Sequence, residues 1–169
     1  MSDVAVRPER LGEAEAIRTV NLRAFGGPLE AAIVDALRGS EGAISLVAIA
    51  ADSIVGHILF TPVDVDGTQR SIRAAGLAPM AVAPEHQGQG IGSRLVRAGI
   101  EACRAAGYQV IVVVGHATYY PRFGFVPGTS KGLECQWPVP PEVFMVLELL
   151  PGVLRDVRGI ARYRPEFSA

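Results

Sequence analysis

Apolar residues in the first part of the chain follow two different spacings. Val4–Arg7 alternates as a short strand does, whereas Leu11–Phe25 repeats apolar residues every three or four positions, as one face of a helix does. Gly26-Gly27-Pro28 interrupts this pattern, and a second helical stripe runs from Leu29 to Leu37 before Gly39. The pattern predicts one strand followed by a pair of helices.

Short runs of β-branched and other apolar residues come next. They are Ile44–Ala50, Ile54–Phe60, Val63–Gly67 with the turn signal Asp66-Gly67, and Ile72–Val82. Only Ala51-Asp52-Ser53 separates the first two runs, which is short enough for an antiparallel hairpin. Pro79 lies inside the last run and cannot donate to a ladder of hydrogen bonds, so it predicts a strand edge or a bulge.

The longest helical pattern lies in the second half of the chain. From Gly90 to Ala106 apolar residues recur at helical spacing, and Gly107 follows as a helix stop. Gln109–Val114 is an almost continuous apolar run, which is typical of a central strand covered on both faces. The remaining pieces are a segment at Ala117–Phe123, a proline-rich loop around Trp137–Pro141, a strand at Val143–Leu149, and short pieces at Val153–Val157 and Gly159–Tyr163.

This alternation of strands and helices predicts an α/β fold with a mixed sheet. A length of 169 residues supports a single domain covering residues 1–169. Hydrophobic residues make up 49% of the chain and charged residues 20%, so the chain can bury enough apolar surface to fold. The net charge of -1 gives no basic excess for a phosphate backbone, so nucleic acid is not expected as a partner.

Composition also bears on membranes, location and metals. The mean hydropathy is +0.28, yet no apolar stretch approaches the ~20 residues that span a bilayer. Met1–Val4 has neither a basic nor an apolar leader region, so a cytoplasmic location is expected. Cys103 and Cys135 lack the spacing of metal ligands, and we interpret both as structural thiols without a metal.

The stretch from Gln87 to Gly92 is the most informative part of the sequence. It is rich in glycine and joins a predicted strand to the long helix. Glycines allow close approach to the backbone, and the unpaired N–H groups at a helix start attract anions. The alternative is a turn that only connects strand and helix. We expect a phosphate or diphosphate to bind here.

Two familiar phosphate motifs do not fit this stretch. A dinucleotide fingerprint starting at Gly88 needs glycine where the chain has Ser93. A Walker loop needs Gly-Lys followed by Ser or Thr, and the stretch has no such triplet. Dinucleotide binding of the Rossmann type and nucleotide hydrolysis are therefore disfavoured.

The motif Gln87-Gly88-Gln89-Gly90-Ile91-Gly92 resembles Q-x-x-G-x-G, the acyl-coenzyme A diphosphate loop of the GNAT superfamily of N-acetyltransferases. Tyr120-Pro121-Arg122-Phe123-Gly124-Phe125 resembles the Tyr-x-x-x-Gly-Phe motif that follows strand five in that superfamily. The sequence segments that flank these motifs are similar to those of the YhbS-type branch of the superfamily. The resemblance covers nearly the whole chain and is strongest from Leu77 to Phe125.

The resemblance implies a GNAT-type fold in which the fourth and fifth strands splay apart and the pantetheine arm of coenzyme A lies in the gap. The residues it assigns to the coenzyme are Met80, Ala81, Val82, Gln87, Gly88, Gln89, Gly90, Ile91 and Gly92. The first three would act through their backbone groups, one of which can polarise the thioester carbonyl.

Tyr120 is the candidate general acid for the departing thiolate, because a phenol stays protonated at neutral pH. Its alternative role is that of a buried aromatic residue. His116 is the candidate base, because it follows the central strand at the end where α/β sites collect. His57, His86 or a water molecule remain alternatives. Leu77–Val82 contains no carboxylate, although many family members have a glutamate base on this strand.

The acceptor amine would bind between the turn Arg23–Leu29 and the loop Glu134–Pro141. Phe25 and Trp137 can supply apolar or cation-binding walls there. Glu30 or Glu134 can attract an ammonium group, although carboxylates at such positions are usually solvated.

The sequence therefore predicts an N-acetyltransferase that uses acetyl-CoA to acetylate a primary amine of a small molecule or peptide. A homodimer is compatible with this interpretation, and no membrane partner is expected. The alternative function is that of a noncatalytic sensor or regulatory module that binds acyl-CoA.

Overall fold

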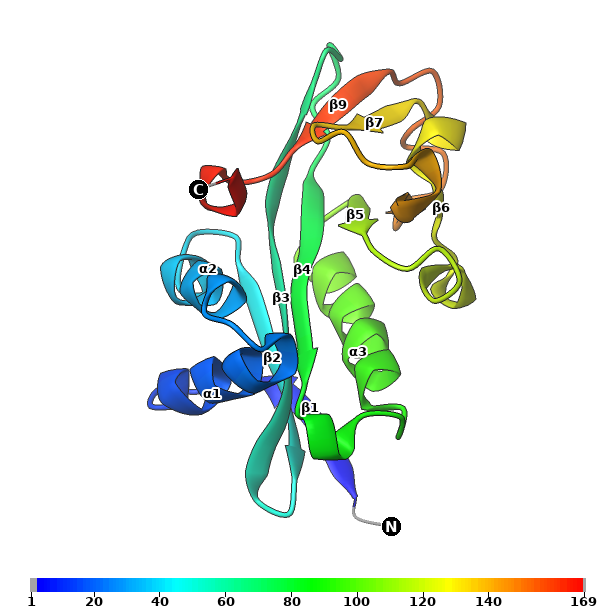
Figure 1. Ribbon diagram of the computed structural model, residues 1–169. Helices are drawn as coiled ribbons and strands as arrows, with labels where there is room; N and C mark the ends of the chain where they lie inside the picture. The colour runs from blue at the N-terminus through cyan, green and yellow to red at the C-terminus, as the bar shows by residue number, and fades with distance from the viewer. Residues whose placement is uncertain (1–2, 169) are drawn as a thin grey trace. The chain divides into compact units, whose positions relative to one another are not determined.

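The structure, a computed structural model, describes residues 3–168. Met1 and Ser2, which belong to the N-terminal stretch interpreted above, lie outside the described residues, as does Ala169. The chain forms two units, and Figure 1 shows its elements. Unit 1 contains the described residues up to Phe60 together with Ala78–Glu101. Unit 2 contains Thr61–Leu77 together with the described residues from Ala102 onward.

The elements combine helices with parallel and antiparallel strands. The helices are α1 (Ala14–Phe25), α2 (Leu29–Leu37) and α3 (Ile91–Ala105). The strands are β1 (Val4–Pro8), β2 (Ile44–Ala50), β3 (Ser53–Asp66), β4 (Ala74–Val82), β5 (Val110–Val114), β6 (Val126–Pro127), β7 (Leu133–Cys135), β8 (Phe144–Glu148) and β9 (Gly159–Arg162). Because β4 runs parallel to β5 while β8 runs antiparallel to it, the predicted α/β fold with a mixed sheet is confirmed.

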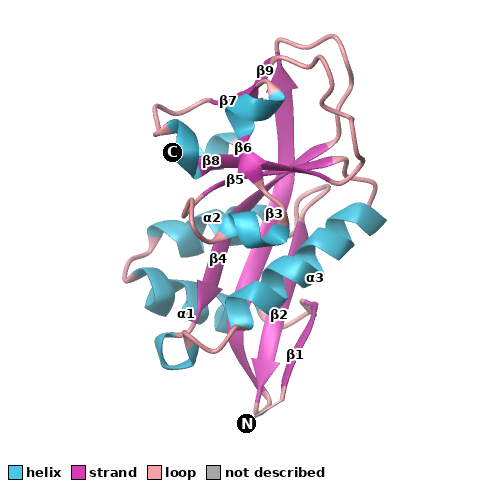
Figure 2. Cartoon of the chain, turned by 90° about the vertical axis from the view of Figure 1, so that its right-hand side faces the viewer, coloured by secondary structure: helices cyan, strands magenta, loops and turns pink. Residues whose placement is uncertain are grey.

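An antiparallel ribbon forms the sheet of unit 1. β1 pairs with β2, and β2 pairs with the first part of β3, as Figure 2 shows for the three neighbouring strands. Ala51 and Asp52 turn the chain between β2 and β3 with φ of +49° and +62°. A two-residue turn with both φ positive matches the right-handed twist of a hairpin, so the predicted hairpin is confirmed.

Helices cover both faces of this part of β3. The Nδ1 atom of His57 lies 3.3 Å from the Asn21 amide of α1. On the other face, a Cβ at Gly56 would lie 3.0 Å from the Leu95 side chain of α3. Successive strand residues point to opposite faces, so α1 and α3 pack on opposite sides of β3. Figure 1 shows the same arrangement.

The first helix begins later than its apolar pattern predicts. Leu11 is fully exposed and lies in a turn with Gly12, whose φ is +91°. The Glu13 carboxylate accepts two hydrogen bonds from the Arg7 guanidinium, at 2.9 and 2.6 Å. These contacts fix the turn outside the helix, so the prediction that helical structure starts at Leu11 is wrong.

The third strand is longer than predicted. β3 is one strand of 14 residues, whereas the sequence pattern separates Ile54–Phe60 from Val63–Gly67. Its last residues, Asp64–Asp66, pair with Ile160–Arg162 of β9, which extends the strand within unit 2. Gly67, with φ of +93°, makes the predicted turn only after the strand has ended.

Unit 2 surrounds the apolar strand β5. Val110–Val113 are buried, and β5 pairs with β4 on one side and β8 on the other, as predicted for a central strand. The ladder to β4 covers only Ala74–Gly76, so it ends before Pro79 and agrees with the predicted interruption there. The sequence pattern missed the short strands β6 and β7, because two or three residues show no periodicity.

Two glycines let large aromatic side chains into the core of unit 2. A Cβ at Gly76 would lie 2.6 Å from the ring of Tyr163, and a Cβ at Gly128 would lie 2.4 Å from the ring of Phe144. Glycine inside a strand often marks such a close approach. These aromatic residues pack in a cluster with Leu133 and other apolar residues of unit 2.

The two cysteines lie as structural thiols would. Cys103 is fully buried, and burial raises the pKa of its thiol to about 12. Cys135 is half-buried, and burial raises its pKa as well. Within residues 3–168, no three His, Cys, Asp or Glu side chains gather in a group that could hold a metal ion. In the same part of the chain, each helix is too short or too polar to cross a bilayer.

Candidate functional site

The glycine-rich stretch lies in unit 1, between the end of β4 and the start of α3. After Val82 the chain forms a 3-10 turn at Pro84–His86 and reaches α3 through the exposed residues Gln87–Gly90. The N–H group of Ala83 donates to the carbonyl of Val55 at 2.8 Å, which fixes the end of β4 to β3. The stretch is therefore an exposed loop attached to a paired strand.

Gly88 and Gly90 have backbone angles that favour glycine, with φ of +74° and +81°. Any other residue is strained there by roughly 1–2 kcal/mol. No described heavy atom lies within 4 Å of the place that a Cβ would take at either glycine. The main chain of the loop is therefore open to a ligand from that side.

Two glutamine side chains hold the shape of this loop. Gln87 Nε2 donates to the Val82 carbonyl at 2.9 Å, and Gln89 Nε2 donates to the Glu85 carbonyl at 3.4 Å. Both bonds run from the loop back to the residues that precede it. The glutamines therefore brace the loop through the backbone.

The start of α3 is suited to a negative charge. The first bond of the helix runs from the Arg94 N–H to the Gly90 carbonyl at 3.1 Å. The N–H groups of Ile91 and Gly92 come before it, where no carbonyl of the helix can accept from them. They lie at the positive end of the helix dipole. Ile91, only 2% exposed, anchors this end of the helix in unit 1.

The other coenzyme residues predicted from the resemblance are the last three of β4. Ala81 is buried, whereas Met80 and Val82 are half-buried. They lead directly into the loop, so unit 1 contains the whole predicted coenzyme set.

The turn between α1 and α2 is an exposed apolar surface in unit 1. Phe25 ends α1 and is 42% exposed, and Leu22 and Leu29 on either side of it are 38% and 57% exposed. Glu30 lies half-buried in the first turn of α2. Leu22 and Phe25 therefore face outward, although the helical stripe of α1 includes them. Gly26, with φ of +71°, ends α1.

Tyr120 lies in unit 2 and is almost fully buried. Its ring packs on Gly115, where a Cβ would lie 2.4 Å from Cε2, and makes an edge contact with the Phe125 ring at 5.6 Å between centroids. Burial raises the pKa of Tyr120 to about 12, with a smaller contribution from Tyr119. The hydroxyl therefore holds its proton at neutral pH and can act as a donor.

His116 lies close to Tyr120 in the chain but has an exposed side chain. Its carbonyl accepts from the N–H groups of Tyr119 at 3.0 Å and Tyr120 at 3.4 Å. The backbone of His116 thus sets the turn that carries Tyr120. Its imidazole is open to solvent.

Sequence reasoning missed Tyr163, which is buried in unit 2. Its hydroxyl has no hydrogen-bond partner among the described residues. Burial raises the pKa of Tyr163, with smaller contributions from Cys135 and Tyr120. The sequence signal that could have indicated it is Gly76, an isolated glycine in an apolar strand.

Trp137 lines a small pocket in unit 2. The pocket has a volume of about 210 Å³ and is lined by Thr129, Glu134, Cys135, Trp137, Val139, Pro141 and Phe144. The Trp137 ring packs on Tyr163, with centroids 4.9 Å apart, and its Nε1–H donates to Ser168 Oγ at 3.3 Å. The pocket combines aromatic walls with the exposed carboxylate of Glu134.

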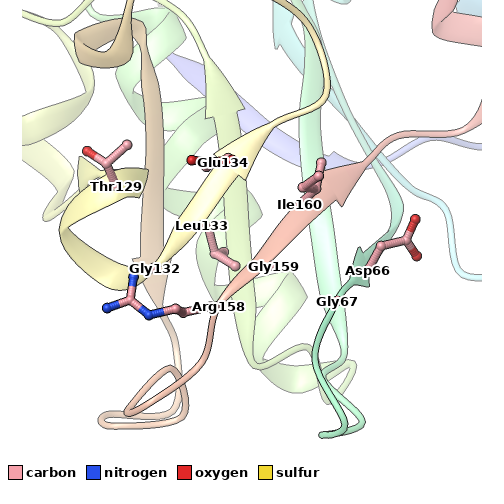
Figure 3. A pocket seen from close by; sticks show the side chains of 9 residues that line it. All are labelled: Asp66, Gly67, Thr129, Gly132, Leu133, Glu134, Arg158, Gly159 and Ile160. Atoms are coloured by element: carbon pink, nitrogen blue, oxygen red, sulfur yellow. The ribbon is translucent and has the colours of Figure 1, made fainter.

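A larger groove in unit 2 is lined by Glu134, one of the carboxylates predicted to attract an ammonium group, and by no other predicted site residue. It has a volume of about 530 Å³ and follows the parallel pair β7 and β9, as Figure 3 shows. Its glycines have a structural reason: a Cβ at Gly132 would lie 1.9 Å from the Val157 carbonyl, and a Cβ at Gly159 would lie 2.6 Å from the Asp66 carbonyl. Close packing of the main chain therefore accounts for these two glycines.

The alternative bases differ in their surroundings. His57 is fully buried, and its Nδ1 accepts from Asn21 Nδ2, which also donates to the Ile17 carbonyl. His57 Nε2–H then donates to Ser45 Oγ at 2.8 Å. Burial, together with the charge of Arg38, lowers the pKa of His57 to about 3. His57 is therefore neutral near pH 7 and too weak a base to collect a proton there.

His86 lies in the 3-10 turn before the loop, half-buried, with Nδ1 3.9 Å from Glu85 Oε1. The predicted site residues fall into two sets, one in each unit. Unit 1 holds the loop, the end of β4, Phe25 and Glu30, and unit 2 holds His116, Tyr120 and Trp137.

Comparison with known proteins gives one family. Residues 41–127 match the family described as an acetyltransferase (GNAT) domain. The chain is 47% identical over 134 residues to the uncharacterized N-acetyltransferase YjhQ of Escherichia coli K12. The aligned region covers 77% of this chain and 74% of YjhQ. The chain is also 32% identical over 166 residues to the uncharacterized N-acetyltransferase YhbS of the same strain. That aligned region covers 96% of this chain and 98% of YhbS.

Two solved structures share the fold over almost the whole chain. The structure of E. coli YhbS in complex with CoA has a TM-score of 0.92 and 31% identity, covering 100% of this chain and 94% of that one. The structure of a GNAT family acetyltransferase from Brucella melitensis in complex with acetyl-CoA has a TM-score of 0.79 and 34% identity, covering 98% of both chains.

Proposed function

The chain belongs to the GNAT family of acetyltransferases and is therefore an acyltransferase, and we propose that it transfers the acetyl group of acetyl-CoA to a primary amine of a small molecule or peptide. The observation that carries the proposal is the coenzyme loop, Gln87–Gly92, with its two left-handed glycines at the start of the 15-residue helix α3. The complexes of YhbS with CoA and of the Brucella protein with acetyl-CoA support acetyl-CoA as the donor.

The coenzyme loop fits a diphosphate by its geometry. The open side of Gly88 and Gly90 lets phosphate oxygens reach the main chain, and the N–H groups of Ile91 and Gly92 add donors at the helix start. The residues proposed to bind the coenzyme are Met80, Ala81, Val82, Gln87, Gly88, Gln89, Gly90, Ile91 and Gly92. Met80–Val82 would hold the pantetheine amides through backbone groups.

The reaction is the attack of a neutral amine on a thioester. A C–N bond forms, the C–S bond breaks, the sulfur leaves as a thiol, and the amine nitrogen loses a proton. Tyr120 is proposed to donate the proton to sulfur, which its raised pKa supports, because the hydroxyl is protonated when the reaction starts. His116 is proposed to accept the amine proton directly or through water.

Binding of the acceptor is proposed to involve Phe25, Glu30 and Trp137. Phe25 and Trp137 offer exposed or pocket-lining aromatic surface, and Glu30 offers a carboxylate for an ammonium group. We further propose that residues 1–169 act as one domain, since β3, β4 and α3 each continue from one unit into the other.

Release of free thiol from acetyl-CoA in the presence of a panel of primary amines tests this function. The proposal expects thiol release that needs both the protein and an amine. Calorimetry with acetyl-CoA in the absence of an amine separates the alternatives: a noncatalytic sensor binds the coenzyme but releases no thiol with any amine. A protein with neither binding nor release would have no acyl-CoA function.

A further inference from the structure

An ion pair joins α1 to the turn that precedes the coenzyme loop. Arg23, in the last turn of α1, donates from both terminal nitrogens to the Glu85 carboxylate, at 2.8 Å to Oε1 and 2.6 Å to Oε2. Glu85 is the middle residue of the Pro84–His86 turn, and its carbonyl accepts from Gln89 Nε2. Both residues of the pair lie in unit 1.

The geometry of this pair is specific although the pair is exposed. The guanidinium and the carboxylate meet through two parallel bonds, which fixes their relative orientation as well as their distance. The two side chains are 49% and 51% exposed, and pairs in such positions add little to folding stability. A contribution to the stability of the fold therefore does not explain why this ion pair is present.

The neighbourhood of Glu85 gives a better reason. Glu85 lies two residues before the coenzyme loop, and its pKa is lowered to about 2 by the bonds from Arg23, so it is ionised at any working pH. The diphosphate of coenzyme A is an anion. A carboxylate without its arginine would present a repelling charge to this anion at the entrance of the loop.

We propose that Arg23 is a positioning residue for the coenzyme loop, which acts through Glu85 by offsetting the charge of that carboxylate toward the incoming diphosphate. This inference rests on the proposed function, because it needs coenzyme A to bind at Gln87–Gly92. It assigns to Arg23 no contact with the coenzyme.

A second ion pair on the same helix provides the matched control. Arg18 of α1 donates to Asp35 of α2 at 2.7 Å, and the two side chains are 46% and 34% exposed. This pair resembles Arg23–Glu85 in chemistry and exposure but involves no residue of the turn or of the coenzyme loop. Arg18→Ala therefore removes a comparable exposed, ion-paired arginine of α1 without changing the Arg23–Glu85 pair.

The test is the affinity for coenzyme A, measured by calorimetry at low and at high ionic strength. Arg23→Ala should weaken binding about three- to tenfold at low ionic strength, and less at high ionic strength, where salt screens the charge. Glu85→Gln should bind as tightly as the wild type or more tightly. The double variant Arg23→Ala/Glu85→Gln should return to within about twofold of the wild type, and Arg18→Ala should not change the affinity.

Three results would overturn the assignment. Wild-type affinity in Arg23→Ala would leave the pair without a role in binding. A double variant as weak as Arg23→Ala would show that the pair acts only through its geometry or that Arg23 touches the coenzyme itself. A wild type that does not bind coenzyme A would refute the proposed function, and this outcome is distinguishable because it precedes any comparison of variants.

Discussion

Tyr120, the proposed general acid, shows how neighbouring residues fix the position of a single side chain. Gly115 makes room for its ring, the His116 carbonyl binds its N–H group, and burial keeps its hydroxyl protonated by raising its pKa to about 12. The Tyr-x-x-x-Gly-Phe motif in the sequence indicated this residue. The contacts that hold its ring were not predictable, because Gly115 contacts the Tyr120 ring only when the residues between them form a turn.

Replacement of Tyr120 by Phe tests its role as the acid. The ring keeps its place while the hydroxyl is removed, so kcat should fall about 10- to 10⁴-fold with little change in the affinity for acetyl-CoA. Tyr119→Phe is the control, since the neighbouring ring packs at 5.1 Å between centroids but is not proposed to react. Equal turnover in Tyr120→Phe and wild type would make Tyr120 a packing residue.

At the scale of elements, the coenzyme loop depends on backbone conformation more than on side chains. Gly90 has φ of +81° and open space around it, so a side chain there meets strain and also covers the main chain. The glycine-rich sequence between a strand and a helix predicted this loop from local information alone. The ion pair of Arg23 with Glu85 was not predictable, because 62 residues separate the partners along the chain.

Gly90→Val should therefore weaken coenzyme A binding strongly while most of the fold remains. The matched control is Gly152→Val in unit 2, where φ is also +81° and no described atom lies within 4 Å of an added Cβ. Both variants should lose a similar free energy of unfolding, about 1–2 kcal/mol, in urea titrations. Calorimetry should show weak binding for the first variant only, and equal affinities would refute the loop assignment.

The buried His57 of β3 is hydrogen-bonded to Asn21 of α1 and Ser45 of β2. Its burial predicts how the free energy of unfolding depends on pH. The pKa of His57 is about 3 in the folded chain and 6.5 in its ordinary state. The unfolded chain therefore binds the proton first, so the fold loses stability as the pH falls below 6.5. Between pH 7 and 5, this single group should lower the free energy of unfolding by about 2 kcal/mol.

Urea unfolding of wild type and His57→Gln at pH 7 and 5 measures this contribution. Glutamine can replace the hydrogen bonds but does not titrate, so its pH-dependent loss should be smaller by about 2 kcal/mol. The range above pH 5 is chosen because Glu13 and Glu85, with pKa of about 2 in the fold against 4.5 ordinarily, act at lower pH. The same pH dependence in both proteins would show that His57 is not buried as described.

For the whole molecule, local patterns predicted most helices and strands, and contacts between residues that are not adjacent in the chain decided the rest. β3 continues to Asp66 because β9, almost a hundred residues later, supplies its partner. Leu11 lies outside α1 because Arg7 and Glu13 fix a turn, which outweighs its place in the apolar stripe. Tyr163 escaped prediction for the same reason, since only the folded chain brings it to Gly76.

The site followed the same rule. Motifs of consecutive residues indicated the coenzyme loop and Tyr120, whereas the residues proposed for the acceptor came from loops that carry no motif. Phe25 lies on an exposed turn and Trp137 lines a pocket shared with Glu134, which supports a role for each in holding an amine. The surfaces proposed for the acceptor come from separate segments, so no short segment of the sequence indicates which amine binds.

The most direct test of the account is the amine-dependent release of coenzyme A from acetyl-CoA, followed by thiol detection and by mass measurement of the acceptor. The account predicts that at least one primary amine of the panel gains one acetyl group for each thiol released, and that Tyr120→Phe slows both together. Acetyl-CoA binding without thiol release or acetylated product across the panel would contradict it.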